Sequence, residues 1–361
     1  MKSSKLILCI FLSYCFVSLS LTSISWAKPR KSAKKSRLLG VKVNLGADRN
    51  FLAKFKESLQ VGNQTQVVPQ DWNEIETMPG QFRPKTNFFA IANHFYSVHK
   101  MPIHISLRPI HTNQNVFPAD LVGKPIDAPQ TIKRFKKLLD WVATQVPNVQ
   151  LVSLAIGSEI DLYAWGDTKR WNAWINFYAA VAPYARKKFP GTLITCETSY
   201  AAFRGRDLER LRRLHQHSDA IAVSYYPMKN RLRGVKSPKV VHSDFETVVS
   251  AIPTKPIFYY QIGYPTSSQL GSSPARQALF ITETFRAWDK HANRIRMLNF
   301  QWMHETPDKG LDHFAKYYQN HTPEFRAFLG SLGLQSWSGA PKPAWAAIKK
   351  EAKARGFAHV K

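Results

Sequence analysis

Short apolar segments alternate with longer amphipathic segments along most of this chain, and this alternation restricts the fold more than any other feature. Eight segments are rich in β-branched and aromatic residues, and helix-length stretches separate them. These candidate strands are residues 41–45, 66–69, 103–107, 149–156, 193–196, 220–224, 256–262 and 296–302. Continuous apolar strands such as LVSLAI are typical of a parallel sheet that is covered by helices.

The segments between the expected strands have the period of amphipathic helices. In residues 132–146 the apolar side chains share one face, and the lysines lie on the other. In residues 275–288 the expected buried stripe consists of Ala278, Leu279, Ile281, Phe285 and Trp288. Eight such units predict an α/β fold with a single (β/α)8 TIM barrel. A C-terminal helical extension, with a last helix at 343–354, is expected to close it.

The first 27 residues have the pattern of a secretory signal peptide. Lys2 and Lys5 precede an apolar run, and Ser25 and Ala27 supply small residues for cleavage. The sequence therefore predicts export to the periplasm, the cell envelope or the extracellular space, with no transmembrane span after cleavage. The alternative is an uncleaved membrane anchor, because the apolar run nearly reaches the roughly 20 residues that a spanning helix needs.

The chain is strongly basic, with 51 Lys and Arg against 24 Asp and Glu and a formal net charge of +27. Residues 28–38 are expected to form a basic disordered arm, followed by the barrel domain at 39–350 and a tail at 351–361. The arm either holds acidic polymers by charge or is a simple linker. Nucleic acid is not expected as the primary partner, because the chain has an export signal and no recognisable nucleic-acid module.

Cysteine and histidine usage argues against disulfides, metals and cofactors. Only Cys196 remains after the signal peptide, so no disulfide can form within the chain. His215 and His217 lie two residues apart, and His94 and His99 lie five apart, so neither pair has the four-residue helical spacing of a metal motif. The chain also lacks a phosphate-binding glycine-rich loop and a serine nucleophile elbow. We expect a monomer with no cofactor.

Four motifs follow the expected strands in order, and the carboxyl ends of barrel strands are where chemistry takes place. They are DWNEIETMPGQF after the second strand, LAIGSEIDLY at the fourth, KPIFYYQIGYPTSS at the seventh and IRMLNFQWMHE at the eighth. Together they resemble bacterial glycoside hydrolase-like proteins of the clan A superfamily, which are related to endo-β-1,4-galactanases and similar β-glycanases. The resemblance covers nearly the whole chain after the signal peptide and implies an oligosaccharide or polysaccharide, including acidic ones, as the partner.

The resemblance implies a catalytic position that this chain has altered. Glu159 occupies the position of the family's general acid/base, although a purely structural role is the alternative. Gln261 occupies the nucleophile position, and an amide cannot form the glycosyl ester of a retaining mechanism. Ser158 stands where the family has Asn. Without an anionic neighbour, Glu159 is expected to be a poorer acid at neutral pH.

Two other carboxylates are candidates to replace the missing nucleophile. Glu197 follows the fifth strand and Glu305 follows the eighth, and either could activate water in a single displacement, with the two carboxyls about 6.5–9.5 Å apart. Ion pairing with the plentiful Arg and Lys residues is the alternative role for both. Asp161 and Asp48 are weaker candidates.

The candidate sugar-binding residues are aromatic or hydrogen-bonding side chains near strand ends. An aromatic ring can lie against the apolar face of a sugar. The aromatic candidates are Trp302, Tyr225, Tyr226, Trp72 and Trp165, and packing in the core or the rim is the alternative role for them. The polar candidates are Arg108, His111, Asn113, Ser158 and His304, of which Arg108, His111 and Asn113 could bind sugar hydroxyls, a uronate or a sulfate.

Three functions are compatible with these features. The first is an exported glycoside hydrolase-like protein that acts on a β-linked polysaccharide. The second keeps the fold and the cleft in a catalytically inactive glycan-binding protein. The third is a basic, polyanion-binding protein of the cell envelope. The amide at Gln261 favours the second function over an ordinary retaining enzyme.

Overall fold

The computed structural model describes residues 37–229 and 232–357. The expected signal peptide and residues 28–36 of the basic arm lie outside these ranges. At residue 37 the described chain is already ordered, since Arg37 forms an ion pair with Asp289 at 2.7 Å. Within the described ranges, no helix is both long and apolar enough to cross a membrane.

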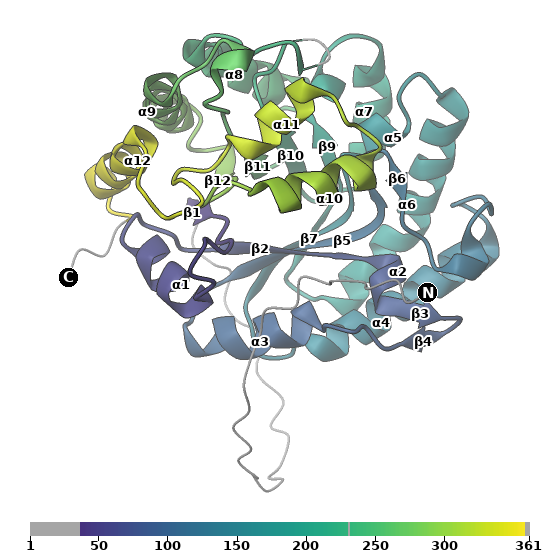
Figure 1. Cartoon of the computed structure of the whole chain (residues 1–361). Coiled ribbons are helices and arrows are strands. Elements are labelled where there is room, and N and C mark those ends of the chain that lie inside the picture. The colour runs from purple at the N-terminus through teal and green to yellow at the C-terminus, as the bar shows by residue number, and fades with distance from the viewer. Residues whose placement is uncertain (1–36, 230–231, 358–361) are drawn as a thin grey trace, which may run out of the picture. The chain divides into compact units, whose positions relative to one another are not determined.

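Parallel strands form the centre of the molecule (Figure 1). The strands in chain order are β1 (Leu38–Val41), β2 (Gln66–Asp71), β5 (Ile103–His111), β7 (Leu151–Ser158), β8 (Leu193–Thr195), β9 (Glu197–Ser199), β10 (Ile221–Tyr225), β11 (Ile257–Ile262) and β12 (Ile295–Phe300). They pair in two paths, β1-β12-β11-β10-β9 and β2-β5-β7-β8. A parallel bridge between Gly40 and Thr65 links the first strands of the two paths, and only Cys196 separates β8 from β9. The expected (β/α)8 barrel is confirmed.

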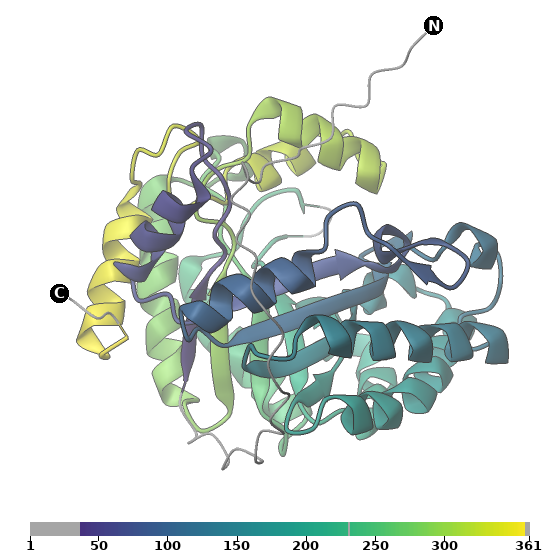
Figure 2. The same ribbon diagram turned by 90° about the horizontal axis from the view of Figure 1, so that it is seen from below.

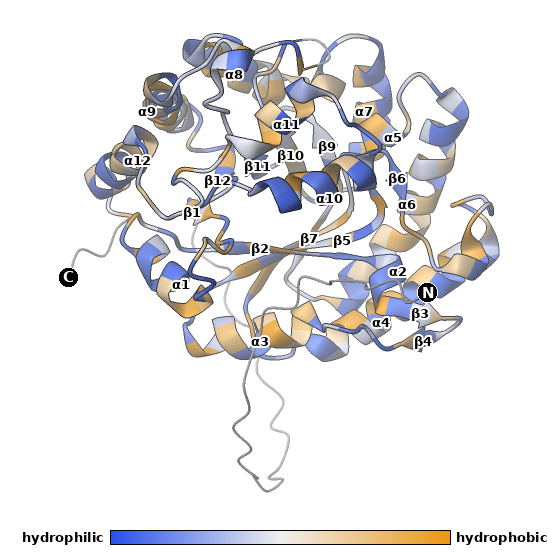
Figure 3. Cartoon of the chain, in the orientation of Figure 1, coloured by the Kyte–Doolittle hydropathy of each residue, from blue (hydrophilic) through white to orange (hydrophobic). Residues whose placement is uncertain are grey.

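One helix follows each strand of the barrel and covers it from outside. These helices are α1 (Phe51–Leu59), α3 (Phe88–Val98), α4 (Pro129–Gln145), α6 (Thr168–Lys188), α7 (Leu208–Gln216), α8 (Val241–Ala251), α9 (Pro274–Lys290) and α12 (Pro343–Ala354). Figure 3 shows the hydrophilic and hydrophobic sides of these helices. The last helix continues past residue 350, and Ala352 is buried in the core, so the expected tail begins inside α12.

The remaining elements are inserted in the loops. They are α2 (Trp72–Ile75), β3 (Glu76–Met78), β4 (Gln81–Phe82), β6 (Gln114–Asn115), η1 (Ala119–Leu121), α5 (Ile160–Tyr163), η2 (Tyr200–Phe203), η3 (Gly205–Asp207), η5 (Pro238–Val240), η6 (Ser268–Leu270), α10 (Asp308–Tyr318) and α11 (Pro323–Gly330). Both α10 and α11 lie between the last strand and α12 in the chain. Figures 1 and 2 show them together at one end of the barrel.

Two predictions about the elements need correction. The first strand was expected at residues 41–45, but β1 ends at Val41, because residues 38–41 pair with β12 and the polar residues Lys42 and Asn44 interrupt the apolar run. In α9, Leu279 is 41% exposed, whereas Phe280 is fully buried. The helix is therefore rotated relative to the expected stripe, and Phe280 stacks on Tyr264 with ring centroids 5.0 Å apart.

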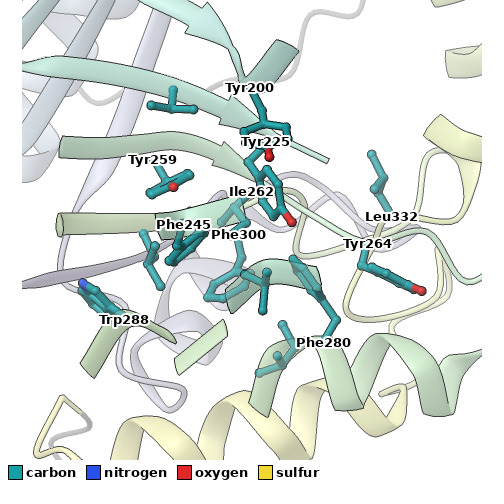
Figure 4. Close-up of a cluster of buried hydrophobic side chains, with 14 of the residues drawn as sticks. Tyr200, Tyr225, Phe245, Tyr259, Ile262, Tyr264, Phe280, Trp288, Phe300 and Leu332 are labelled. Atoms are coloured by element: carbon teal, nitrogen blue, oxygen red, sulfur yellow. The ribbon is translucent and has the colours of Figure 1, made fainter. Parts of the chain in front are cut away.

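Aromatic side chains fill much of the layer between the barrel and the helices. Figure 4 shows one such cluster, which includes Tyr225, Phe245 and Tyr259. The rings of Phe245 and Tyr259 stack with centroids 4.4 Å apart. Side chains alternate along a strand, so Tyr225 faces this layer while its neighbour Ser224 faces the inside of the barrel.

The end of β7 contains a glycine that the packing requires. Gly157 has φ +82°, and a Cβ atom at this position would lie 2.6 Å from the Trp174 ring. Two residues later, Glu159 also adopts the left-handed backbone conformation, with φ 51°. This turn places Ser158 and Glu159 at the mouth of the barrel.

We predict that Gly157→Ala destabilises the protein more than Gly191→Ala does. Both glycines have φ +82°, but a Cβ atom at Gly191 would meet nothing within 4 Å. The control should lose roughly 1–2 kcal/mol from backbone strain alone. Gly157→Ala should lose about 1–3 kcal/mol more because its methyl group overlaps Trp174. Free energies of unfolding from denaturant titration test this, and equal losses would contradict the packing argument.

Candidate functional site

A cavity of about 310 Å³ opens at the carboxyl ends of the barrel strands. Its walls come from β2, β5, β7, β9 and β11, from residues just after β1 and β12, and from one face of α10. This volume lies at the lower end of the roughly 300–1,000 Å³ of small-molecule sites. The carboxyl face is also where (β/α)8 barrels keep their reactive groups.

Three polar side chains from three strands meet in the wall of this cavity. The Gln261 Nε2 group donates a hydrogen bond to Glu197 Oε1 at 2.9 Å, and the Ser158 hydroxyl donates to Glu197 Oε2 at 2.7 Å. Tyr226 donates its hydroxyl to Gln261 Oε1 at 3.0 Å, which fixes the orientation of the amide. Glu197 is therefore the carboxyl group that contacts the Gln261 amide.

The buried position of Glu197 changes its acidity. Burial raises its pKa, the charge of Glu159 raises it further, and the hydrogen bonds from Ser158 and Gln261 oppose this only in part, so the pKa lies at about 8. A carboxyl group with this pKa holds its proton at neutral pH. Glu197 is thus a carboxyl neighbour of Glu159 that the sequence reasoning did not pair with it, and it carries no charge at neutral pH.

Glu159 lies beside this cavity, but it is not among the described residues that line it. It directly follows β7 and caps the short helix α5. Its two carboxylate oxygens accept hydrogen bonds from the hydroxyl groups of Ser224 and Thr112, the latter at 2.7 Å. The carboxylate is therefore held by β10 and by the loop after β5.

A second polar network crosses from β2 and β5 to α10. The Arg108 side chain contacts the Asp71 carboxylate at 2.6 Å, and His111 lies between the hydroxyl groups of Tyr317 and Tyr318, at 2.7 and 3.0 Å. Burial would raise the pKa of Asp71, but the charge of Arg108 and hydrogen bonds from His111 and Tyr317 outweigh it and lower the pKa to about 2. Asp71 is therefore ionised at any physiological pH.

Trp302 forms an aromatic wall of the cavity. It is joined to Gln301 by a cis peptide bond, and its ring lies parallel to that of Phe314 on α10, with centroids 5.9 Å apart and an interplanar angle of 3°. Both residues line the cavity. Tyr226 lies nearby and packs against Phe328.

Several predicted site residues lie elsewhere. Trp72 and His304 are fully buried, the former packed against Phe117 and the latter bonded to the Asn44 backbone, so neither presents a face to a ligand. Tyr225 faces the helix layer, where it donates a hydrogen bond to Asp244. These three expectations need correction, because strand alternation turns Tyr225 outward, Trp72 begins helix α2 and packs in the core, and packing encloses His304.

The other candidates lie at the rim or in ion pairs. Glu305 is paired with Lys342 at 2.5 Å and is not among the described cavity residues. Trp165 is 60% exposed, with the Arg206 guanidinium over its ring. Asn113 donates a hydrogen bond to the Tyr318 carbonyl. Asp161 accepts two hydrogen bonds from Ser199. Asp48 forms an ion pair with Lys54.

The sequence reasoning missed several cavity residues. Asp71 ends β2, so the strand-end rule applied to Arg108 would also have found it. Lys42 was hidden because the expected first strand placed it inside a strand instead of after one. The α10 side chains that line the cavity, including Tyr317 and Tyr318, have no strand-end signal, and only the folded chain brings α10 to the opening. Residues 37–229 and 232–357 contain no cluster of His, Cys, Asp and Glu suited to a metal ion.

Comparison with solved structures places this barrel among glycoside hydrolases by fold. A variant of GH5_18 from Bifidobacterium longum subsp. longum, in complex with Manβ1-4GlcNAc, matches with a TM-score of 0.67 and 12% identity, over 88% of this chain and 78% of that one. GH5_18 from Streptomyces cattleya, in complex with GlcNAc, matches with a TM-score of 0.67 and 14% identity, over 90% of this chain and 81% of that one. An exo-β-1,4-mannosidase from an Opitutaceae bacterium matches with a TM-score of 0.69 and 13% identity, over 90% of this chain and 62% of that one.

No protein-family model matches the sequence, and no curated protein matches it either. At 12–14% identity, the structural similarity establishes the fold and no more. The chain shares the (β/α)8 fold of these glycoside hydrolases. Its substrate and activity must be argued from its own cavity.

We predict that Glu197 makes the stability of the protein fall as the pH rises. Its pKa is about 8 in the folded protein, above the ordinary value of 4.5, so the unfolded state loses this proton first. The contribution is complete below about pH 4.5 and is lost by about pH 8. The Gln side chain of Glu197→Gln does not titrate, so this variant keeps its stability while wild type loses some. Its free energy of unfolding should therefore rise relative to that of wild type by a few kcal/mol as the pH goes from about 4.5 to about 8, at about 1.4 kcal/mol per unit of pKa difference.

Denaturant titrations at several pH values test this expectation. Glu209→Gln is the control, because Glu209 is an exposed carboxylate on α7 with a side chain 73% accessible. The free energy of unfolding of Glu209→Gln should differ from that of wild type by the same amount at each pH. A constant difference for Glu197→Gln as well would show that Glu197 does not keep its proton in the folded protein.

Proposed function

We propose that this protein binds a β-linked oligosaccharide in the cavity and does not cleave it by a retaining mechanism. The observation that carries this proposal is the hydrogen bond that the Gln261 amide donates to Glu197. By the resemblance of the strand-end motifs, Gln261 stands where clan A hydrolases have their nucleophile. Retaining hydrolysis needs a carboxylate there, with the two carboxyl groups about 5–5.5 Å apart. The glycoside hydrolase-like fold, the Trp302 ring and the hydrogen-bonding groups on the walls support a sugar as the ligand.

Hydrolysis is a second candidate, because a carboxyl group does contact the amide. Glu197 is buried, interacts with Glu159 and keeps its proton at neutral pH. Pairs of carboxyl groups whose pKa values are pushed apart often divide acid and base roles. In this version Glu197 donates its proton to the leaving glycosidic oxygen, while the Glu159 carboxylate accepts a proton from the water that attacks the anomeric carbon in a single displacement.

The location of the protein is also a proposal. Residues 1–27 carry the export pattern, and residues 28–38 carry a dense positive charge. Such a segment would attract acidic polymers of the cell envelope by charge alone. This polyanion binding is distinct from the cavity, because it should weaken steeply with salt and with deletion of the arm.

We predict that wild type binds a β-1,4-linked manno-, gluco- or galacto-oligosaccharide and releases no reducing sugar from it. Glu159→Gln should bind the same ligand without a large loss, whereas Gln261→Glu should restore slow hydrolysis by placing a carboxyl group at the nucleophile position. Calorimetry and a reducing-sugar assay measure the two properties. If wild type is active and both Glu159→Gln and Glu197→Gln abolish the activity, the second candidate is correct.

We also predict that Trp302→Ala weakens this binding by about tenfold, or about 1.4 kcal/mol, because the sugar loses an aromatic surface. Trp165→Ala is the matched control, since Trp165 is exposed and is not among the described cavity residues. Its affinity should equal that of wild type. An equal loss for both variants would place the ligand outside the cavity.

A further inference from the structure

Lys42 places an ammonium group in the cavity without a carboxylate partner. It directly follows β1, lines the cavity and donates a hydrogen bond from Nζ to the carbonyl oxygen of Val67 at 2.8 Å. Burial lowers its pKa to about 8, and the charge of Arg108 contributes to the shift. No ion pair in the described part of the chain involves Lys42, so its charge is balanced only by one carbonyl dipole.

Three carboxyl groups line the cavity, those of Asp71, Glu74 and Glu197, and among the described residues none of them forms an ion pair with Lys42. Glu74 accepts a hydrogen bond from the backbone N–H group of Asp71. Asp71 is already paired with Arg108 at 2.6 Å. Glu197 carries its proton at neutral pH, so it contributes no negative charge there. Lys42 is half-buried, and a charge that is partly removed from water without an ion-pair partner is costly, because the protein interior screens and solvates it poorly. An anion that enters the cavity would relieve this cost.

Two further polar groups on the cavity walls have no partner. The Ser106 hydroxyl and the Gln301 Oε1 atom are buried without a hydrogen bond, and the two residues are 3% and 8% exposed. Ser106 faces the barrel interior on β5, two residues before Arg108. A hydroxyl group is a donor as well as an acceptor, so Ser106 can donate to an anionic oxygen. The Ser106 hydroxyl is unused among the described residues, and the Lys42 ammonium group, which has three N–H donors, uses one of them on the Val67 carbonyl.

We propose that this cavity selects an acidic sugar, whose carboxylate or sulfate group binds Lys42. This inference rests on the proposed glycan binding and names the class of glycan. Carboxylates and sulfate esters share the chemistry that matters here, an anionic oxygen that accepts a charge-assisted hydrogen bond. The alternative is a purely structural ammonium group, which would give no preference between acidic and neutral ligands.

The test compares three ligands of equal length: a neutral β-1,4-manno-oligosaccharide, a β-1,4-mannuronate and a sulfated manno-oligosaccharide. Calorimetry at ~0.3 M salt suppresses binding by exposed charges. Wild type should bind at least one acidic ligand about tenfold more tightly than the neutral one, and the acidic ligand that binds identifies the source of the anion. Lys42→Met keeps most of the side-chain volume, and its ratio of acidic-ligand to neutral-ligand affinity should fall from about ten to about one.

Lys133→Met is the matched control, since it removes one positive charge from an exposed site on α4, outside the described cavity residues. It should keep the preference of wild type. Thermal stabilisation of wild type by each ligand gives a second measure that does not depend on any variant folding, and the acidic ligand should give the larger shift. Equal binding of acidic and neutral ligands would overturn this inference and leave the proposed function standing. Failure of all three to bind would overturn both.

Discussion

The closure of the parallel sheet is the constraint on which the rest of this structure depends. The two paths of paired strands are joined by the bridge between Gly40 and Thr65 and by the chain that runs from β8 into β9, and every strand presents its carboxyl end to the same face. The bridge between Gly40 and Thr65 connects β1 to the segment that leads into β2. As a result, Lys42 and Gln301, near opposite ends of the described chain, line one cavity.

Within that cavity, the amide of Gln261 and the carboxyl group of Glu197 depend on each other. A carboxylate at position 261 would lie against Glu197, and two buried like charges in contact cannot both be ionised. The amide avoids this conflict, because it donates to Glu197 and accepts from Tyr226. The arrangement favours a stable, satisfied network over the separated acid and nucleophile that a retaining enzyme needs.

The sequence predicted the barrel and the strand-end residues well, because periodicity and strand ends are local signals. Glu159 and Gln261 were found in this way, and both lie at the mouth of the barrel. Tyr225 was misplaced because the two-residue alternation, which turns every second side chain toward the helices, was not applied to it. Trp72 was misplaced because it begins the short helix α2, which the sequence analysis did not predict. Lys42 was missed because the first strand ends three residues after Leu38, earlier than its apolar pattern suggested. Long-range contacts decide the rest, above all the position of α10.

The helix α10 determines which polar groups of the cavity remain open to a ligand. Its residues Tyr317 and Tyr318 already bond to Asp71 and His111, so these groups of β2 and β5 gain little from a sugar hydroxyl group. The groups without such partners are Lys42, Ser106 and Gln301, on the other walls of the same cavity. Because a ligand gains most where the protein's own polar groups are unsatisfied, affinity and selectivity should come from these walls and from the Trp302 ring. The residues that the family resemblance identifies would then orient a sugar whose acidic group is bound elsewhere in the cavity.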